Sequence, residues 1–112
     1  MSDTMLSTQE RTAINAFGRR VRKLLGGQFV RGLLFGSKAR GDFREGSDID
    51  IFVLIRKQSP ASLGKVAKAA NDVWYDYDID LSFVLYDLYE EKRNLEIESP
   101  FFRAVYAEGI RI

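Results

Sequence analysis

The chain has 112 residues, of which 46% are hydrophobic and 29% charged, and its formal net charge at pH 7 is +1. This length predicts one globular domain over residues 1–112, and the near-neutral charge gives no overall attraction to nucleic acid or to an anionic membrane. Because the sequence has no cysteine and no histidine, it excludes disulfides, zinc sites built from thiolates or imidazoles, and Ser-His or Cys-His catalysis.

The N-terminal segment, MSDTMLSTQE, lacks the basic and then apolar order of a secretion signal. No apolar run approaches the roughly 18 residues that a membrane span requires. We therefore expect a cytoplasmic protein that does not bind membranes.

The first predicted element is an amphipathic helix in residues 7–25, ended by Gly26 and Gly27. Ser7 is followed three residues later by Glu10, which is the pattern of a capping box. The polar side of this helix carries a basic cluster of Arg19, Arg20, Arg22 and Lys23. Because no aromatic residues interleave with the cluster, we expect a solvated helix face and no direct nucleic-acid binding.

Residues 29–36 and 48–56 predict two strands. The second contains IFVLI, which is apolar on both faces, so we expect a central strand covered on both sides. Residues 59–77 predict a helix. Its expected buried side is formed by Leu63, Val66, Ala69, Ala70 and Val73.

Residues 77–86, YDIDLSFVLY, predict a third strand, and residues 87–96 and 99–109 predict two short terminal helices. Three strands covered by helices indicate a small α/β (α+β) sheet flanked by helices. We expect Phe101, Phe102 and Tyr106, at helical spacing, to be core residues and not a base-stacking site. For Trp74 and Tyr75 the sequence leaves two alternatives: they are core residues, or they form a partner-binding patch.

Two aspartates, Asp48 and Asp50, stand where the second strand begins. Alternation along a strand points both side chains to one side, roughly 6.5–7 Å apart along the backbone. Carboxylates without His or Cys favour Mg²⁺ or Mn²⁺ over zinc, and such an ion completes its shell with substrate phosphates and water.

A Gly-Ser turn precedes these aspartates and has the features of a phosphate-binding segment. Gly36 removes the Cβ that would obstruct a phosphate, and Ser37 adds a hydroxyl donor. Lys38 and Arg40 can neutralise further phosphate charge, although Arg40 has the alternative of an ion pair with Asp42. With a third carboxylate as proton acceptor and two metal ions, these residues fit nucleotidyl transfer from a nucleoside triphosphate.

Gly36-Ser37, ten intervening residues and Asp48-Ile49-Asp50 with apolar flanks resemble the signature of the polymerase-β-like nucleotidyltransferase superfamily. The string GSKARGDFREGSDIDIFV is especially similar to the minimal nucleotidyltransferase (MNT) group, whose pattern GSxARGxxxxxSDxDL ends here with Ile51. The C-terminal SPFFRAVYAEGIRI also resembles the closing segment of that group. The resemblance implies a palm-like mixed sheet.

The resemblance also implies Mg²⁺-dependent transfer of a nucleoside monophosphate, AMP from ATP, with two ions and with Asp48 and Asp50 as metal ligands. Gly36 and Ser37 would hold the triphosphate. For the third carboxylate, Asp76, Asp78 and Asp80 alternate along the predicted third strand. The family pattern, an aspartate between apolar residues, best matches Asp80 as catalytic residue and metal ligand, because Asp80 lies between Ile79 and Leu81. Asp78 is the alternative for this role. Asp76 is expected to be solvated.

Many members of the MNT group are antitoxins that transfer AMP to a tyrosine of a HEPN-domain ribonuclease toxin, so the resemblance implies such a partner. One alternative is a non-catalytic binding module that masks a partner protein. A second alternative, transfer to a small molecule, ranks lower because relatives of that kind carry an additional helical domain. The sequence has no visible element for reading a base.

Overall fold

The sheet of the computed structural model, which describes residues 6–41 and 48–112, has the strand order β3-β2-β1-β4. Strand β1 (Phe29–Phe35) pairs antiparallel with β2 (Ile49–Ile55) and with the short β4 (Ile110–Arg111). Strand β2 pairs parallel with β3 (Leu81–Asp87). The predicted mixed sheet is therefore confirmed, and β4 is an element that the sequence did not reveal.

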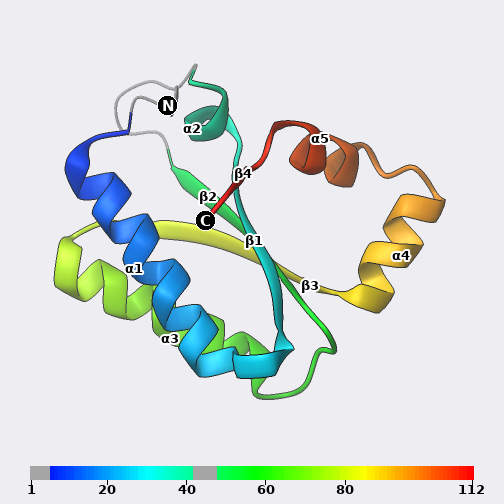
Figure 1. Ribbon diagram of the computed structural model, residues 1–112, viewed down its shortest axis with the longest axis horizontal. Helices are drawn as coiled ribbons and strands as arrows, with labels where there is room; N and C mark the ends of the chain where they lie inside the picture. Colours follow the sequence, from blue (N-terminus) through cyan, green and yellow to red (C-terminus); the bar gives the residue numbers. More distant parts are fainter. Residues whose placement is uncertain (1–5, 42–47) are drawn as a thin grey trace.

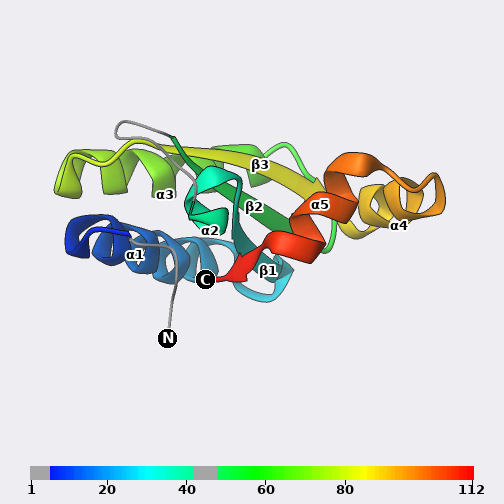
Figure 2. The ribbon, with the colours of Figure 1, turned by 90° about the horizontal axis from the view of Figure 1, so that it is seen from above.

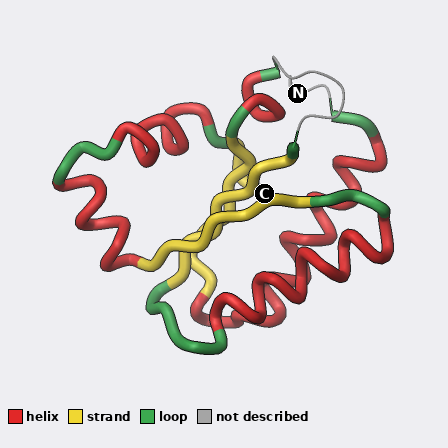
Figure 3. Tube along the Cα trace, turned by 180° about the vertical axis from the view of Figure 1, so that it is seen from behind, coloured by secondary structure: helices red, strands yellow, loops and turns green. Residues whose placement is uncertain are grey.

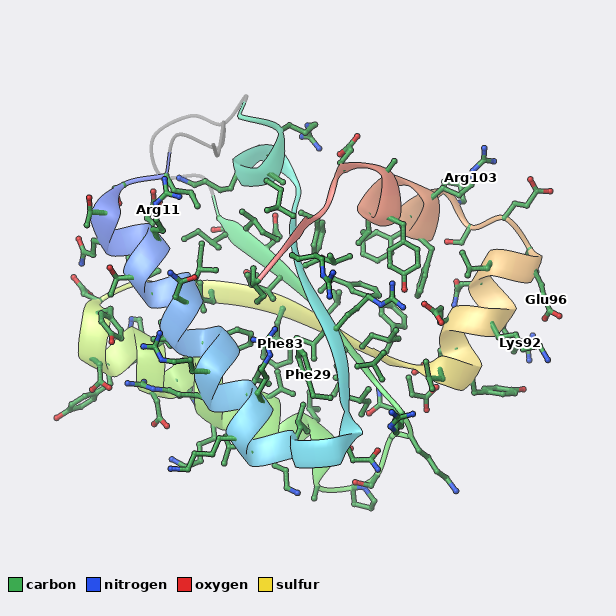
Figure 4. All side chains as sticks on the ribbon, viewed as in Figure 1. Arg11, Phe29, Phe83, Lys92, Glu96 and Arg103 are labelled. Atoms are coloured by element: carbon green, nitrogen blue, oxygen red, sulfur yellow. The ribbon has the colours of Figure 1, made fainter. Side chains whose placement is uncertain are left out.

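Helices α1 (Thr8–Leu25) and α3 (Ser62–Tyr77) lie side by side on one face of the sheet (Figures 1 and 2). The apolar stripes of both helices pack on alternate residues of the strands, among them Ile51, Val53 and Ile55 of β2. Figure 4 shows Phe29 and Phe83 reaching from β1 and β3 into the same layer. This layer is the larger of the two cores.

The opposite face of the sheet is covered by α5 (Pro100–Glu108), with α4 (Leu88–Glu96) at its side (Figure 2). Phe52 of β2 is fully buried there, with its ring edge-on to Phe102 at 5.5 Å and to Tyr106 at 5.6 Å. Edge-to-face aromatic pairs of this kind add about 0.5–1.5 kcal/mol beyond their buried area. Strand β2 is thus buried on both faces as predicted, and the tube view in Figure 3 shows the strands running between the two groups of helices.

The predicted ends of the first and last helices are present. Ser7 and Glu10 form the capping box of α1, and Gly26 follows with a φ of 56° at the start of a 3-10 turn (Gly26–Gln28). Ser99 caps α5, with Pro100 in its first turn. Within the described residues, no helix is both long and apolar enough to cross a membrane.

The predicted third strand begins too early. The helix ends at Tyr77, as predicted, and Asp78 follows it in the left-handed conformation, with its N–H bonded to the Trp74 carbonyl. The helix persists because Tyr77 packs against the larger core, while the Asp76 carboxylate accepts a hydrogen bond from Arg20 at 2.7 Å. The strand therefore starts only at Leu81.

One side chain of α3 differs from its predicted burial, and two that the sequence left open are exposed. Leu63, expected on the buried side, is 58% exposed; it lies in the first turn of the helix, which begins only at Ser62. Trp74 and Tyr75 are also exposed, by 57% and 86%, so neither is a core residue.

Candidate active site

Asp48 and Asp50 come together at the start of β2. In the sheet, Asp50 pairs with Phe35 of β1 on one side and with Ser82 of β3 on the other. Asp48 precedes the strand and is exposed, whereas Asp50 is half-buried. Burial raises the pKa of the Asp50 carboxyl, and the negative charge of Asp48 raises that pKa further. The site therefore holds two like charges whose mutual repulsion a cation would relieve.

Gly36 lies directly against Asp50. Its φ is 78°, and a Cβ added to Gly36 would be only 2.7 Å from Asp50 Oδ2. Glycine is thus required for two reasons, the positive φ and the close approach of the carboxylate. The backbone at Gly36 and the Asp50 carboxylate are therefore direct neighbours.

A short helical turn, α2 (Ser37–Arg40), follows Gly36. The Gly36 carbonyl accepts hydrogen bonds from the N–H groups of Ala39 and Arg40, and Gly41 ends the turn with a φ of 82°. The predicted Gly-Ser turn therefore continues into one turn of helix, in which Ser37 is half-buried.

The two basic residues of α2 are engaged with acidic residues far away in the sequence. Lys38 is buried, and its ammonium lies 2.8 Å from Glu10 Oε2. Arg40 Nη1 lies 3.2 Å from Glu108 Oε1. Asp42, the alternative partner for Arg40, is outside the described residues. Contact of Lys38 or Arg40 with a phosphate stays a prediction.

Asp80 stands at the edge of the sheet that also carries Asp48. In the parallel register, Ile49 is the partner of Leu81, so Asp48 and Asp80 directly precede paired residues of neighbouring strands. Asp78, its rival, is the end residue of α3 and lies outside the strand. Asp80 is exposed and lines a groove of about 310 Å³ between α3 and β3.

The aspartates nevertheless do not form a ready-made three-carboxylate metal site. Among residues 6–41 and 48–112, no group of three or more acidic side chains is close enough together to hold a metal ion. The donor chemistry still suits Mg²⁺, because one or two carboxylates suffice when phosphates and water complete the shell. The neighbouring carboxylates of Asp48 and Asp50, beside a backbone cradle at Gly36 that a Cβ would fill, fit that arrangement.

Sequence reasoning missed two residues that shape this site. Glu10 was identified only as a helix cap, although its second oxygen holds Lys38. Glu108 gave no signal, since it is 68 residues from its partner Arg40. The 28-residue separation of Glu10 and Lys38 leaves no local pattern either.

Comparison with known proteins gives a consistent result. A family model described as "Nucleotidyltransferase domain" matches residues 17–106. A Methanocaldococcus jannaschii protein named "Putative protein adenylyltransferase MJ0604" is 34% identical over an alignment of 110 residues. The aligned parts are 89% of this chain and 94% of that protein. "Putative protein adenylyltransferase MJ0141", from the same organism, is 34% identical over 74 residues, covering 65% of this chain and 75% of that protein.

Among solved structures, one described as a "putative nucleotidyltransferase from Sulfolobus solfataricus" aligns over 80% of this chain and 83% of its own, with a TM-score of 0.42 and 18% identity. The family match and the MJ0604 alignment each extend over most of the chain and include the segment from Gly36 to Asp80. They confirm the resemblance on which the sequence analysis relied. The chain therefore belongs to the nucleotidyltransferase domain family.

Proposed function

We propose that this nucleotidyltransferase-family chain transfers AMP from ATP, in a Mg²⁺-dependent reaction, to a hydroxyl of a partner protein. The proposed acceptor is a tyrosine of a HEPN-type ribonuclease toxin, which makes the chain the antitoxin of a cytoplasmic toxin-antitoxin pair. The observation that carries the nucleotide part is the contact between the Gly36 backbone and the Asp50 carboxylate. The protein acceptor is supported by the names of the two M. jannaschii relatives.

In this proposal each residue has a distinct task. Asp48 and Asp50 hold Mg²⁺, with Asp80 contributing to a second ion. When bound, the metal neutralises phosphate charge and stabilises the attacking and leaving oxygens. Gly36 lets the triphosphate approach the backbone, where the Ser37 hydroxyl can donate a hydrogen bond to a phosphate oxygen.

The proton of the acceptor hydroxyl passes to the Asp80 carboxylate. The freed oxygen forms a bond to the α-phosphorus of ATP, and the bond from that phosphorus to the bridging oxygen breaks. Pyrophosphate carries away the electron pair. The products are an AMP ester of the acceptor and pyrophosphate, so atoms and charge balance.

The direct experiment incubates the protein with α-labelled ATP, Mg²⁺ and a candidate HEPN-domain partner protein. We expect label on the HEPN protein, and none with the Asp48→Asn or Asp50→Asn variant. A partner that is bound and inhibited but never labelled would instead support the non-catalytic masking module. The exposed Trp74 and Tyr75 on α3 are the observation that favours that second function.

A further inference from the structure

An apolar groove of about 230 Å³ opens beside the candidate site, between α5 and the end of β1. Phe35, Gly36 and Phe101 line it, together with Arg40 and Glu108. Figures 1 and 2 show α5 next to α2 at this end of the strand. The groove therefore begins at the same glycine that lies against Asp50.

The wall of the groove is aromatic and partly open to solvent. The Phe101 ring lies edge-on to Phe35, with ring centroids 5.5 Å apart and an interplanar angle of 88°. Phe101 is 37% exposed, whereas the adjacent Phe102 is 1% exposed and belongs to the core. The prediction of a core role thus holds for Phe102 and is wrong for Phe101, because the helix turns Phe101 toward the groove.

The groove and the carboxylates lie on the same face of the sheet. Phe35 and Asp50 are cross-strand partners, and paired residues direct their side chains to one face. Phe35 packs with the core beneath α5. A ligand with phosphates at Gly36 could therefore extend along this face into the groove without crossing the sheet.

The rim of the groove carries groups that can bind the edge of a heterocycle. Arg40 Nη1 and Glu108 Oε1 lie 3.2 Å apart, and both side chains are more than 40% exposed. A guanidinium donates hydrogen bonds and a carboxylate accepts them. Together they match a ring that has acceptor nitrogens and an exocyclic amine better than they match a phenol.

We propose that this groove is the nucleobase subsite: the base of the nucleoside triphosphate lies against Phe101, with its polar edge toward Arg40 and Glu108. The inference rests on the proposed function, since it needs a nucleotide whose phosphates lie at Gly36. It assigns an element for base contact that the sequence did not reveal. The groove suits one flat ring, because it is small, apolar inside and polar only at its rim.

The test compares two ligands that share the phosphates but not the base. Dissociation constants of Mg²⁺-ATP and of Mg²⁺-tripolyphosphate are measured by calorimetry for the wild type and for Phe101→Ala. We expect roughly tenfold weaker ATP binding, in line with alanine substitution of a base-stacking aromatic, and unchanged tripolyphosphate binding. Tyr89→Ala is the matched control, because Tyr89 is a 66% exposed aromatic on α4 that is not among the groove residues.

The outcomes separate this inference from the proposed function. Equal affinity of the wild type and Phe101→Ala for ATP overturns the subsite while leaving nucleotide binding intact. Equal weakening for both ligands also overturns it, because the defect then lies in the phosphate segment. Failure of the wild type to bind either ligand overturns the proposed function itself.

A second variant covers the case in which Phe101→Ala does not fold. Glu108→Gln keeps the size of an exposed side chain and replaces an acceptor oxygen by an amide donor. We expect the ratio of ATP to GTP affinity to fall, since adenine offers an amine where guanine offers a carbonyl oxygen. An unchanged ratio would contradict the placement of the base edge at Glu108.

Discussion

The Lys38 ammonium lies 2.8 Å from Glu10 Oε2, while Glu10 Oε1 accepts the N–H of Ser7. One carboxylate thus completes the capping box of α1 and also neutralises a buried cation behind the Gly-Ser segment. Burial by itself would raise the pKa of Glu10, but the hydrogen bonds and charge of Lys38 and the bonds from Ser7 lower it. The pair ties the position of α2 to the first turn of α1.

Glu10→Gln should cost about 1–3 kcal/mol of unfolding free energy, because the buried ammonium loses its charged partner. Lys38→Met should cost less, since the Glu10 side chain is 19% exposed and the Lys38 side chain only 4%. The lowered pKa of Glu10 means that its contribution is complete above the ordinary value of 4.5 and is lost as the pH falls through the folded-state pKa. Urea unfolding at several pH values would show this acid-dependent loss in the wild type and not in Glu10→Gln.

Gly36→Ala should destabilise the protein by about 1–3 kcal/mol and greatly reduce transfer, because the new Cβ meets Asp50 Oδ2 in a backbone conformation that favours glycine. Gly64→Ala is the matched control. Gly64 lies in α3 with open space around its Cβ position, so alanine there should stabilise the helix by about 0.5–1 kcal/mol. Thermal unfolding and the transfer assay measure both effects; a harmless Gly36→Ala would refute the close-contact argument.

Asp50→Asn should raise the free energy of unfolding in metal-free buffer and lower transfer by roughly two orders of magnitude or more. The stability gain follows because a half-buried charge beside Asp48 is removed. Unfolding in the presence of EDTA and single-turnover transfer with Mg²⁺ give the two readouts. Normal transfer by this variant would remove Asp50 from the metal site.

Mg²⁺ and ATP together should raise the melting temperature more than either does alone, since the metal and the triphosphate complete each other's coordination. At a ligand concentration of 100 times Kd the gain is about 2.7 kcal/mol, or a Tm increase of roughly 10 °C for a domain of this size. Differential scanning fluorimetry with each ligand omitted in turn tests it. Equal shifts for ATP with Mg²⁺ and ATP with EDTA would contradict metal-assisted binding.

Asp80→Asn should lower the single-turnover rate by roughly two to four orders of magnitude and leave much of the nucleotide affinity, as expected for loss of a positioned general base. Asp78→Asn should have a much smaller effect, because Asp78 ends α3 while Asp80 borders β3 next to Asp48. A slow Asp78→Asn variant beside a normal Asp80→Asn variant would reverse the assignment. If both variants transfer at the wild-type rate, the general base is another residue of this chain or a residue of the partner.

The parts of the fold that could be predicted are those that local sequence determines. The Ser7-Glu10 cap is a pattern with a spacing of three residues, and β2 is recognisable because its last five residues, 51–55, are all apolar. The start of β3 at Leu81 was missed because a helical and an alternating pattern overlap where α3 ends, and packing of Tyr77 on the core decides between them.

The candidate site likewise has residues that a local motif reveals and residues whose contacts depend on distant parts of the sequence. Gly36, Asp48 and Asp50 are visible in a single motif, and the close approach of Gly36 to Asp50 follows from the pairing of Phe35 with Asp50. The partners of Lys38 and Arg40 were beyond prediction because they are 28 and 68 residues away. The opening of Phe101 toward a groove depends on how α5 lies across β1, which no local pattern records.

The pairing of β1 with β4 has a kinetic consequence. It joins Leu33 to Arg111, 78 residues later in the sequence, through only two residues of each strand. Because closing so long a loop is entropically unfavourable and this ladder offers few bonds in return, β4 should dock late in folding, after β1, β2 and β3 have associated. Two hydrogen bonds of Ile112 then hold this last strand in place. The Ile112 N–H donates to the Gly32 carbonyl of β1 at 3.1 Å, and the Ile112 carbonyl accepts a hydrogen bond from Arg22 of α1.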